Sequence, residues 1–418
     1  MEVVYSHCAG LDVHKKTVVA CRITRNPAGS RESQTQTFGT MTAELERLSH
    51  WLCEGGVTHV AMESTGAYWR PVYNILEGAF TLLLVNPAHI KNVPGRKTDV
   101  KDAEWIAGLL EVGLLKGSFV PEAEQRDLRD LTRERANLVR ERASVVNRIQ
   151  KILETANIKL GSVAANVCGV SGTAMLKAIV QGEEDPEVLA SLARGRLKDK
   201  EEDLRAALVG RLRPSHLILL NVLLQQVEGF DAGIGTLNDA IKEFGRPFEE
   251  ALDLLDTIPG IGRPLAEVVV SEIGTDMSRF PTPGHLCAWA GVAPGNNQSG
   301  GRILSSRSRK GCPALKKALV QAAHAAVRKP DIYPSAQYHR LAARRGKKRA
   351  ILAVAHTILV DIYYMLQRKE PYQEHGGDYF DKRQPEALLK RLTRQAERIG
   401  YVLTPNNPTS YAGTAGFS

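Results

Sequence analysis

The feature that most constrains the fold is the order of apolar segments in the first 120 residues. Short apolar runs, bounded by polar and turn residues, predict strands at 3–13, 17–23, 33–38, 57–62 and 81–85. Apolar residues at helical spacing predict helices at 41–53 and 68–79, and a further helix begins near residue 99. Three strands followed by helix, strand, helix, strand and helix predict a mixed α/β domain.

Four carboxylates lie on or at the ends of the predicted strands and helices of this domain. Asp12 lies on the first predicted strand, Glu63 ends the fourth, and Asp99 and Asp102 begin the last helix. Residues three apart share a helix face, and neighbouring carboxylates repel each other unless a cation neutralises them. The element order is that of the ribonuclease-H-like fold, in which these acids would meet at one sheet edge and hold two Mg²⁺ or Mn²⁺ ions. Considered alone, the Asp pair could equally be the first turn of a solvated helix capped by Thr98.

The turn between the first two strands argues against one rival fold. The actin and sugar-kinase superfamily also opens with a strand that carries Asp and a hairpin, but that hairpin needs glycine so that phosphate can approach the backbone. Here the turn is His14-Lys15-Lys16. The ribonuclease-H-like (RuvC-like) fold is therefore favoured.

Two long helical stretches follow. Apolar residues recur at heptad steps from 121 to about 160, with Arg135 and Arg142 on the same stripe, and a second apolar stripe runs from 214 to 244. The pattern is typical of a coiled-coil arm, and a hairpin folded on itself and pairing between chains remain equal alternatives. The glycine-rich stretch 161–172 is expected to turn the chain.

Residues 254–273, LLDTIPGIGRPLAEVVVSEI, resemble a helix-hairpin-helix motif. In such a motif glycines expose backbone amides at a helix N-terminus, and here Gly260 and Gly262 would offer them to a nucleic-acid phosphate. An ordinary helical hairpin with a glycine turn is the alternative.

A basic segment follows at 286–317. Ser299 lies in a stretch rich in Gly, Asn and Ser, and the nearby cations are Arg302, Arg307, Arg309, Lys310, Lys316 and Lys317. The formal net charge of +9 and the pI near 9.2 favour a polyanionic partner. Without further context Ser299 is one loop serine among several. Residues 313–327 and 350–366 predict apolar core helices, and RRGKKR at 344–349 predicts a basic turn.

Other features exclude several protein classes. The six cysteines form no CxxC pair, which argues against a zinc ribbon and a disulfide framework. The N-terminus lacks a signal-peptide pattern, and the apolar stretch 351–366 is interrupted by His356 and Asp361. We therefore expect a cytoplasmic protein that does not span a membrane.

Five motifs in order, AGLDVHKKT, AMESTGAYW, GRKTDVKDAEWIA, TIPGIG and WAGVAPGNNQSGGR, resemble the DEDD transposases of the IS-one-ten family of insertion sequences. The resemblance implies a metal site of Asp12, Glu63, Asp99 and Asp102 and a serine nucleophile at Ser299. It also implies donor and target double-stranded DNA, a structured noncoding guide RNA (the bridge RNA) and a tetrameric assembly.

The corresponding domains are a RuvC-like domain at 1–120, a helical arm at 121–250, a transposase domain at 251–370 and a tail at 371–418. Two other functions remain open at this point. One is a RuvC-like junction resolvase or nuclease that activates water, and the other is a catalytically silent nucleic-acid-binding protein.

Overall fold

The computed structural model describes residues 2–26, 29–64, 66–86, 102–295, 297–305, 308, 310–383 and 385–404, and only the backbone of 297–299, 303, 304, 387 and 391. The chain divides into two compact units, Met1–Pro121 and Glu122–Ser418. Each unit is described by itself.

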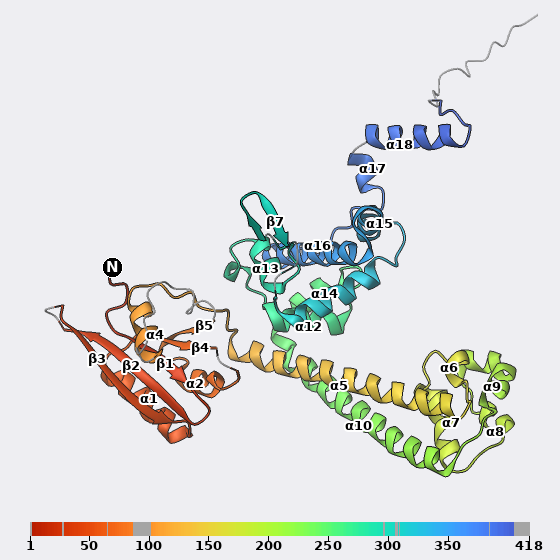
Figure 1. Cartoon of the computed structure of the whole chain (residues 1–418), viewed down its shortest axis with the longest axis horizontal. Coiled ribbons are helices and arrows are strands. Elements are labelled where there is room, and N and C mark those ends of the chain that lie inside the picture. The colour runs from red at the N-terminus through yellow and green to blue at the C-terminus, as the bar shows by residue number, and fades with distance from the viewer. Residues whose placement is uncertain are drawn as a thin grey trace, which may run out of the picture. The chain divides into compact units, whose positions relative to one another are not determined.

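The N-terminal unit is built on a five-stranded mixed sheet (Figure 1). Its elements are β1 (Cys8–Val13), β2 (Thr17–Arg25), β3 (Arg31–Gly39), α1 (Thr42–Glu54), β4 (His59–Glu63), α2 (Trp69–Leu76), β5 (Thr81–Val85) and α4 (Asp102–Glu111). The strand order is β3-β2-β1-β4-β5. β1 pairs antiparallel with β2 and parallel with β4, and β4 pairs parallel with β5.

Helices cover both faces of this sheet. Leu45, Leu48 and Leu52 of α1 share a buried core with Leu11 and Met62 on one face. On the other face Ala103, Ile106 and Leu110 of α4 pack with Cys8 and Ala61. Alternate residues of β1 and β4 therefore face α4, which sets the direction of the acidic side chains. The predicted mixed α/β sheet is confirmed, although α2 ends at Leu76 rather than at residue 79.

The second unit begins with two long helices, α5 (Ala123–Thr155) and α10 (Pro214–Phe244), that pack against each other. Arg142 donates to Asp231 and Arg148 to Gln226, so the two helices run antiparallel. Of the two alternatives for the arm, this is the hairpin folded on itself.

Short helices connect α5 to α10 and share an apolar core with the end of α5 and the start of α10. They are α6 (Leu160–Val163), α7 (Val170–Val180), α8 (Pro186–Ser191), η1 (Gly195–Lys200) and α9 (Glu201–Leu208). The expected turn at 161–172 is thus partly wrong, because α7 begins at Val170. Gly172 lies inside that helix. The position requires glycine, because a Cβ there would lie 2.2 Å from the carbonyl oxygen of Val167.

The rest of the unit is a helical bundle with one small hairpin. Its elements are η2 (Arg246–Phe248), α11 (Glu249–Asp256), α12 (Arg263–Ile273), η3 (Met277–Arg279), α13 (Pro283–Ala290), β6 (Asn297–Ser299), β7 (Arg302–Ser305), α14 (Pro313–Ala326), α15 (Tyr333–Arg345), α16 (Lys347–Arg368), α17 (Tyr379–Arg383) and α18 (Pro385–Arg398). The predicted core helices are α14 and α16. The basic segment 344–349 is the end of α15, Gly346 and the start of α16.

Buried ion pairs attach the arm to this bundle. Arg133 of α5 donates two hydrogen bonds, of 2.7 and 2.9 Å, to the buried carboxylate of Glu272 at the end of α12. Arg135 donates to Glu267 of α12 at 2.6 Å. Arg133 and Arg135 of α5 therefore anchor α5 to α12, whereas Arg142 pairs with Asp231 of α10.

Two helices of the described chain, α10 and α16, are long and apolar enough to cross a membrane by length and composition alone. More than half of the apolar window of α16 is buried inside the unit. α10 packs along α5, and 22% of its apolar window is buried.

Candidate active site

The register of the sheet brings Asp12 and Glu63 to neighbouring positions. β1 and β4 pair in parallel with Leu11 opposite Met62, so the next residue of each strand is Asp12 and Glu63. Asp12 lies four residues after Cys8, and Glu63 lies two residues after Ala61, so each is on the same face of the sheet as that residue. Cys8 and Ala61 pack under α4. The two carboxylates therefore lie at the same edge of the sheet, on the face that α4 covers.

α4 runs antiparallel to β1, and this places Asp102 at the same edge. The backbone amides of Val4 and Tyr5 donate to Glu111 near the end of α4, while the Cys8 thiol lies 3.7 Å from the carbonyl oxygen of Ala107. Asp102, the first residue of the helix, consequently lies toward the end of β1 that carries Asp12.

Gly10 makes this approach possible. A Cβ at Gly10 would lie 2.3 Å from the Ala107 nitrogen and 2.4 Å from the Ala103 oxygen, so the backbone of α4 rests directly on β1. Any side chain at this position would push the helix away, and Asp102 with it.

Asp12 also has a partner that the sequence analysis did not identify. The imidazole Nε2 of His14 lies 3.0 Å from Asp12 Oδ2. Asp12 is 22% exposed, and His14 is mostly exposed. The spacing Asp-Val-His at the end of β1 indicates this contact, because residues two apart lie on one face of a strand.

The chemistry of these side chains suits a hard divalent cation, because every donor is a carboxylate oxygen. Asp99 lies outside the described residues. Among the described ones, no three His, Cys, Asp or Glu side chains gather closely enough to hold a metal ion.

Ser299 lies at the tip of a two-residue β-hairpin, not in an irregular loop. β6 and β7 pair antiparallel with Ser299 opposite Arg302, and Gly300 and Gly301 have φ of +56° and +77°. Positive φ at both central residues is the type I′ geometry, which glycine adopts without strain. A Cβ at either glycine would meet nothing within 4 Å, so the backbone conformation favours glycine there and packing does not. The hairpin projects from the helical bundle (Figure 1).

Basic residues lie within this hairpin and follow it in the sequence. Arg302 and Lys310 are exposed, and Arg307 and Arg309 lie outside the described residues. Lys310 also lines a cavity of about 570 Å³ together with Arg133, Trp289 and Cys312. Arg133 is already paired with Glu272, so Lys310 beside the indole of Trp289 is the group that suits a nucleic-acid strand here.

Gly260 and Gly262 join α11 to α12. Gly260 has φ of +90°, and a Cβ there would lie 2.3 Å from the Ala322 oxygen, so this glycine packs against α14. Gly262 is the exposed N-cap of α12, and the Asp256 carboxylate lies near it. Arg263 pairs with Glu249 and Asp253 of α11. A phosphate at Gly262 would therefore have acidic neighbours, and its binding there stays a prediction.

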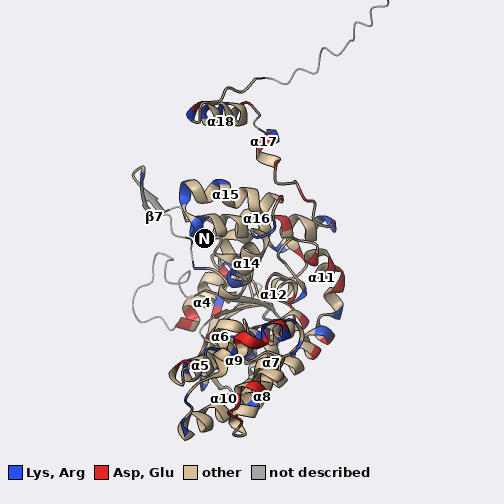
Figure 2. Ribbon diagram, turned by 90° about the vertical axis from the view of Figure 1, so that its right-hand side faces the viewer, with Lys and Arg blue, Asp and Glu red and all other residues tan. Residues whose placement is uncertain are grey.

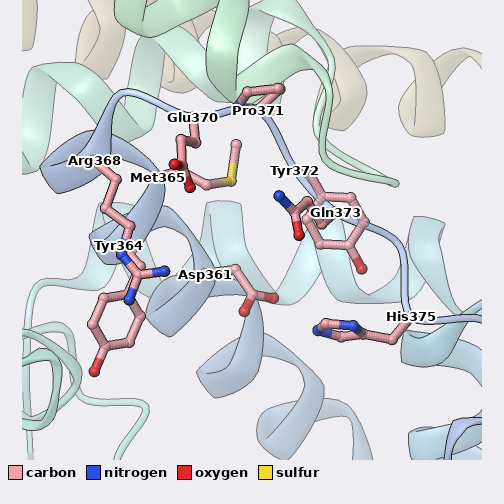
Figure 3. Close-up of a pocket in the computed structure, with 9 residues that line it drawn as sticks. All are labelled: Asp361, Tyr364, Met365, Arg368, Glu370, Pro371, Tyr372, Gln373 and His375. Carbon is pink, nitrogen blue, oxygen red and sulfur yellow. The ribbon is translucent and has the colours of Figure 1, made fainter.

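A separate acidic pocket of about 190 Å³ lies between α16 and residues 370–375. Figure 3 shows the Asp361 carboxyl group pointing into it, on the side of Tyr372 and His375. Burial, and next the negative charge of Glu374, raises the pKa of Asp361 to about 6.

Comparison with known proteins identifies the family. A DEDD transposase model of the IS110 (IS-one-ten) type matches residues 9–158, and the model of the transposase IS116/IS110/IS902 family matches residues 252–340.

Individual relatives agree with these matches. The transposase for insertion sequence element IS1111A of Coxiella burnetii is 27% identical over 320 residues, covering 75% of this chain and 79% of the relative. A probable family 20 transposase of Pseudomonas aeruginosa is 26% identical over 64% of this chain and 71% of its own length. The pilin gene-inverting protein of Moraxella bovis is 32% identical over 126 residues, which are 29% of this chain and 38% of that protein.

These matches confirm the resemblance seen in the five motifs, and a catalytically silent binding protein is excluded. The acids of the sheet edge and the serine hairpin fall inside the matched regions. The chain belongs to the IS110 family of insertion-sequence transposases.

Proposed function

We propose that this transposase cuts and rejoins DNA with four carboxylates, Asp12, Glu63, Asp99 and Asp102, and a serine nucleophile, Ser299. The observation that supports the proposal is the common edge of β1 and β4, where Asp12 and Glu63 take neighbouring register positions, together with the start of α4 at Asp102 toward the same end of β1. The strand order β3-β2-β1-β4-β5, with one antiparallel and one parallel half, supports a ribonuclease-H-like (RuvC-like) assignment for the unit.

The four acids would hold Mg²⁺ or Mn²⁺, as two ions, since oxygen ligands of this charge fit such cations. When bound, the metal would neutralise the charge on the phosphate under attack. The chain itself supplies the orientation. Gly10 sets the distance between α4 and β1, and His14 holds one oxygen of Asp12.

Ser299 would attack the DNA phosphorus with its hydroxyl oxygen. The bond between phosphorus and the 3′ oxygen breaks, the serine loses its proton, the departing 3′ oxygen gains one, and a 5′ phosphoserine ester remains. The ester replaces one phosphodiester bond by another, so reversal of the step rejoins strands without an external energy source. The names of the gene-inverting relatives support this, because inversion requires that cut ends be rejoined.

We further propose a structured guide RNA, a tetrameric assembly and a cytoplasmic, nucleoid-associated location. The net positive charge supports two nucleic-acid partners. Exposed Ile218, Leu219 and Val222 form an apolar face on α10 that suits pairing between copies. The turn between α11 and α12 is proposed as a helix-hairpin-helix contact through Gly260 and Gly262.

The test of the acidic site is Asp102→Asn. The substitution removes a carboxylate charge with little change in volume, so we expect strand cleavage in Mg²⁺ to fall by at least 100-fold while DNA binding is kept. The matched control is Glu104→Gln on the same helix, because Glu104 accepts a hydrogen bond from Thr35 of β3 and is not one of the four acids. Cleavage by Asp102→Asn at the wild-type rate would refute the acidic site.

A further inference from the structure

A second cavity opens at the base of the serine hairpin and has no role in the function proposed above. It measures about 510 Å³ and lies among α15, α16 and the two ends of the hairpin segment. Its walls are mainly apolar. They include Val292, Pro294, Leu341, Leu352 and Ala353. The size and the apolar lining suit a flat organic ring with a substituent, and pockets of this kind bind small molecules or bases.

Two neutral polar groups line the cavity. The amide nitrogen of Gln337 donates to Thr357 Oγ1 at 2.8 Å, while its amide oxygen is buried and has no hydrogen-bond partner among the described residues. A buried acceptor without a donor is unfavourable, so a ligand that donates to it after a small rotation of the amide is favoured. His356 is half-buried, and burial lowers its pKa, which keeps the imidazole neutral at pH 7.

Two arginines stand where the cavity meets solvent. Arg345 ends α15, Arg349 lies in the first turn of α16, and Gly346 turns the chain between them with φ of +82°. Both are exposed, and neither takes part in an ion pair within the described part of the chain. Figure 2 shows this basic end of α15. Free guanidinium groups beside the positive end of a helix attract phosphate.

We infer that this cavity holds one unpaired nucleotide of the DNA. Its base would enter the apolar slot and donate an amino hydrogen to Gln337, and its phosphates would bind Arg345 and Arg349. The inference rests on the proposed function only in taking DNA as the ligand. An apolar slot, one hydrogen-bonding amide and external cations are the groups that recognise a base taken out of its stack.

The position of the cavity explains why a transposase would need it. Pro294 and Ser308, which line the cavity, flank the hairpin that carries Ser299. Ser299 is five residues after Pro294, at most about 17 Å of extended chain. At about 3.4 Å per nucleotide, the captured base would lie within about five steps of the phosphate that Ser299 attacks. Capture of one base would then fix the register of the strand at the nucleophile.

The experiment compares two DNA duplexes binding to the full-length protein, one fully paired and one with a single bulged 2-aminopurine. We expect the bulged duplex to bind at least 10-fold more tightly, about 1.4 kcal/mol. Leu352→Trp fills the cavity and should reduce the preference to less than about 2-fold, with affinity for the paired duplex unchanged. Val188→Trp, on the exposed surface of α8, is the control and should keep the preference.

A second variant keeps the test decisive if Leu352→Trp does not fold. Gln337→Met should lose the preference for bulged 2-aminopurine over bulged purine, which lacks the amino group. No preference in the wild type, or a preference that both cavity variants retain, overturns the inference. Capture of a bulged RNA nucleotide but not of a DNA one also overturns it. Failure of the wild type to bind either duplex would instead contradict the proposed function.

Discussion

At the scale of single residues, two acids differ in their surroundings, and burial raises the pKa of one of them. Asp12 is 22% exposed and has the imidazole of His14 as a partner. Asp361 lies in a pocket with Glu370, Tyr372 and His375, and burial raises its pKa from the ordinary 3.8 to about 6. The folded chain therefore holds a proton on Asp361 that the unfolded chain releases at lower pH.

This shift predicts that stability falls as the pH rises from about 4 through 6. Replacing Asp361 by Asn removes the titration, so the free energy of unfolding above pH 6 should increase, by at most about 3 kcal/mol for a shift of roughly two pKa units. Below pH 4 the variant and the wild type should agree. Urea denaturation from pH 4 to 8 measures this. Asp239→Asn, on the exposed surface of α10, should show no such dependence, and a parallel response of both variants would refute the shift.

At the scale of elements, the contact between α4 and β1 positions the acidic edge. Gly10→Ala puts a methyl group about 2.3 Å from backbone atoms of α4, and we expect a loss of about 1–3 kcal/mol of stability because two backbones cannot repack as side chains do. Cleavage should fall as well, since Asp102 moves with the helix.

The control for Gly10→Ala is a glycine in α4 itself. A Cβ at Gly108 meets nothing within 4 Å, so Gly108→Ala should stabilise by up to about 1 kcal/mol through helix propensity. Urea midpoints of the two variants should shift in opposite directions. A Gly10→Ala protein as stable as the wild type would show that α4 does not rest on β1.

The elements of the N-terminal unit could be predicted because their signal is local. The continuous apolar runs of β1 and β4 reflect burial on both faces of the sheet, and the leucine spacing of α1 reflects its one buried face. The β6–β7 hairpin was missed although Gly300-Gly301 is a turn signal, because its strands are three and four residues long and largely polar. The role of Gly10 could not be read from the sequence, since it depends on a helix about 100 residues away.

At the scale of the whole molecule, charge governs partner binding. The net charge of +9, with exposed Arg302, Lys310 and Lys317, predicts that DNA affinity falls steeply with salt. Each phosphate contact contributes about −0.9 to the slope of log K against log salt. Arg302→Ala and Lys310→Ala should each make the slope about 0.9 less steep in a fluorescence titration from 50 to 200 mM salt. Lys151→Ala on α5 is the control, and a flat salt dependence of the wild type would contradict phosphate contacts.

The pockets of the second unit could not be predicted from the sequence. The Asp361 pocket joins α16 to residues 370–375, and the cavity beside the hairpin joins segments from Val292 to Thr357. Neither has a local pattern, because the side chains meet only after the helices pack. His356 and Asp361 could be recognised as polar residues within an apolar helix, but their neighbours could not.

The central claim, that strands are rejoined through a serine ester, is tested most directly by trapping the protein on a nicked suicide substrate. The wild type and Ser305→Ala should give a denaturation-resistant protein–DNA adduct in the presence of Mg²⁺, and Ser299→Ala should give none. Ser305 is the matched control because it lies on the opposite strand of the same hairpin. If Ser299→Ala still forms the adduct, or if the wild type cuts DNA without forming one, the serine mechanism is wrong and hydrolysis by activated water, as in a junction resolvase, replaces it.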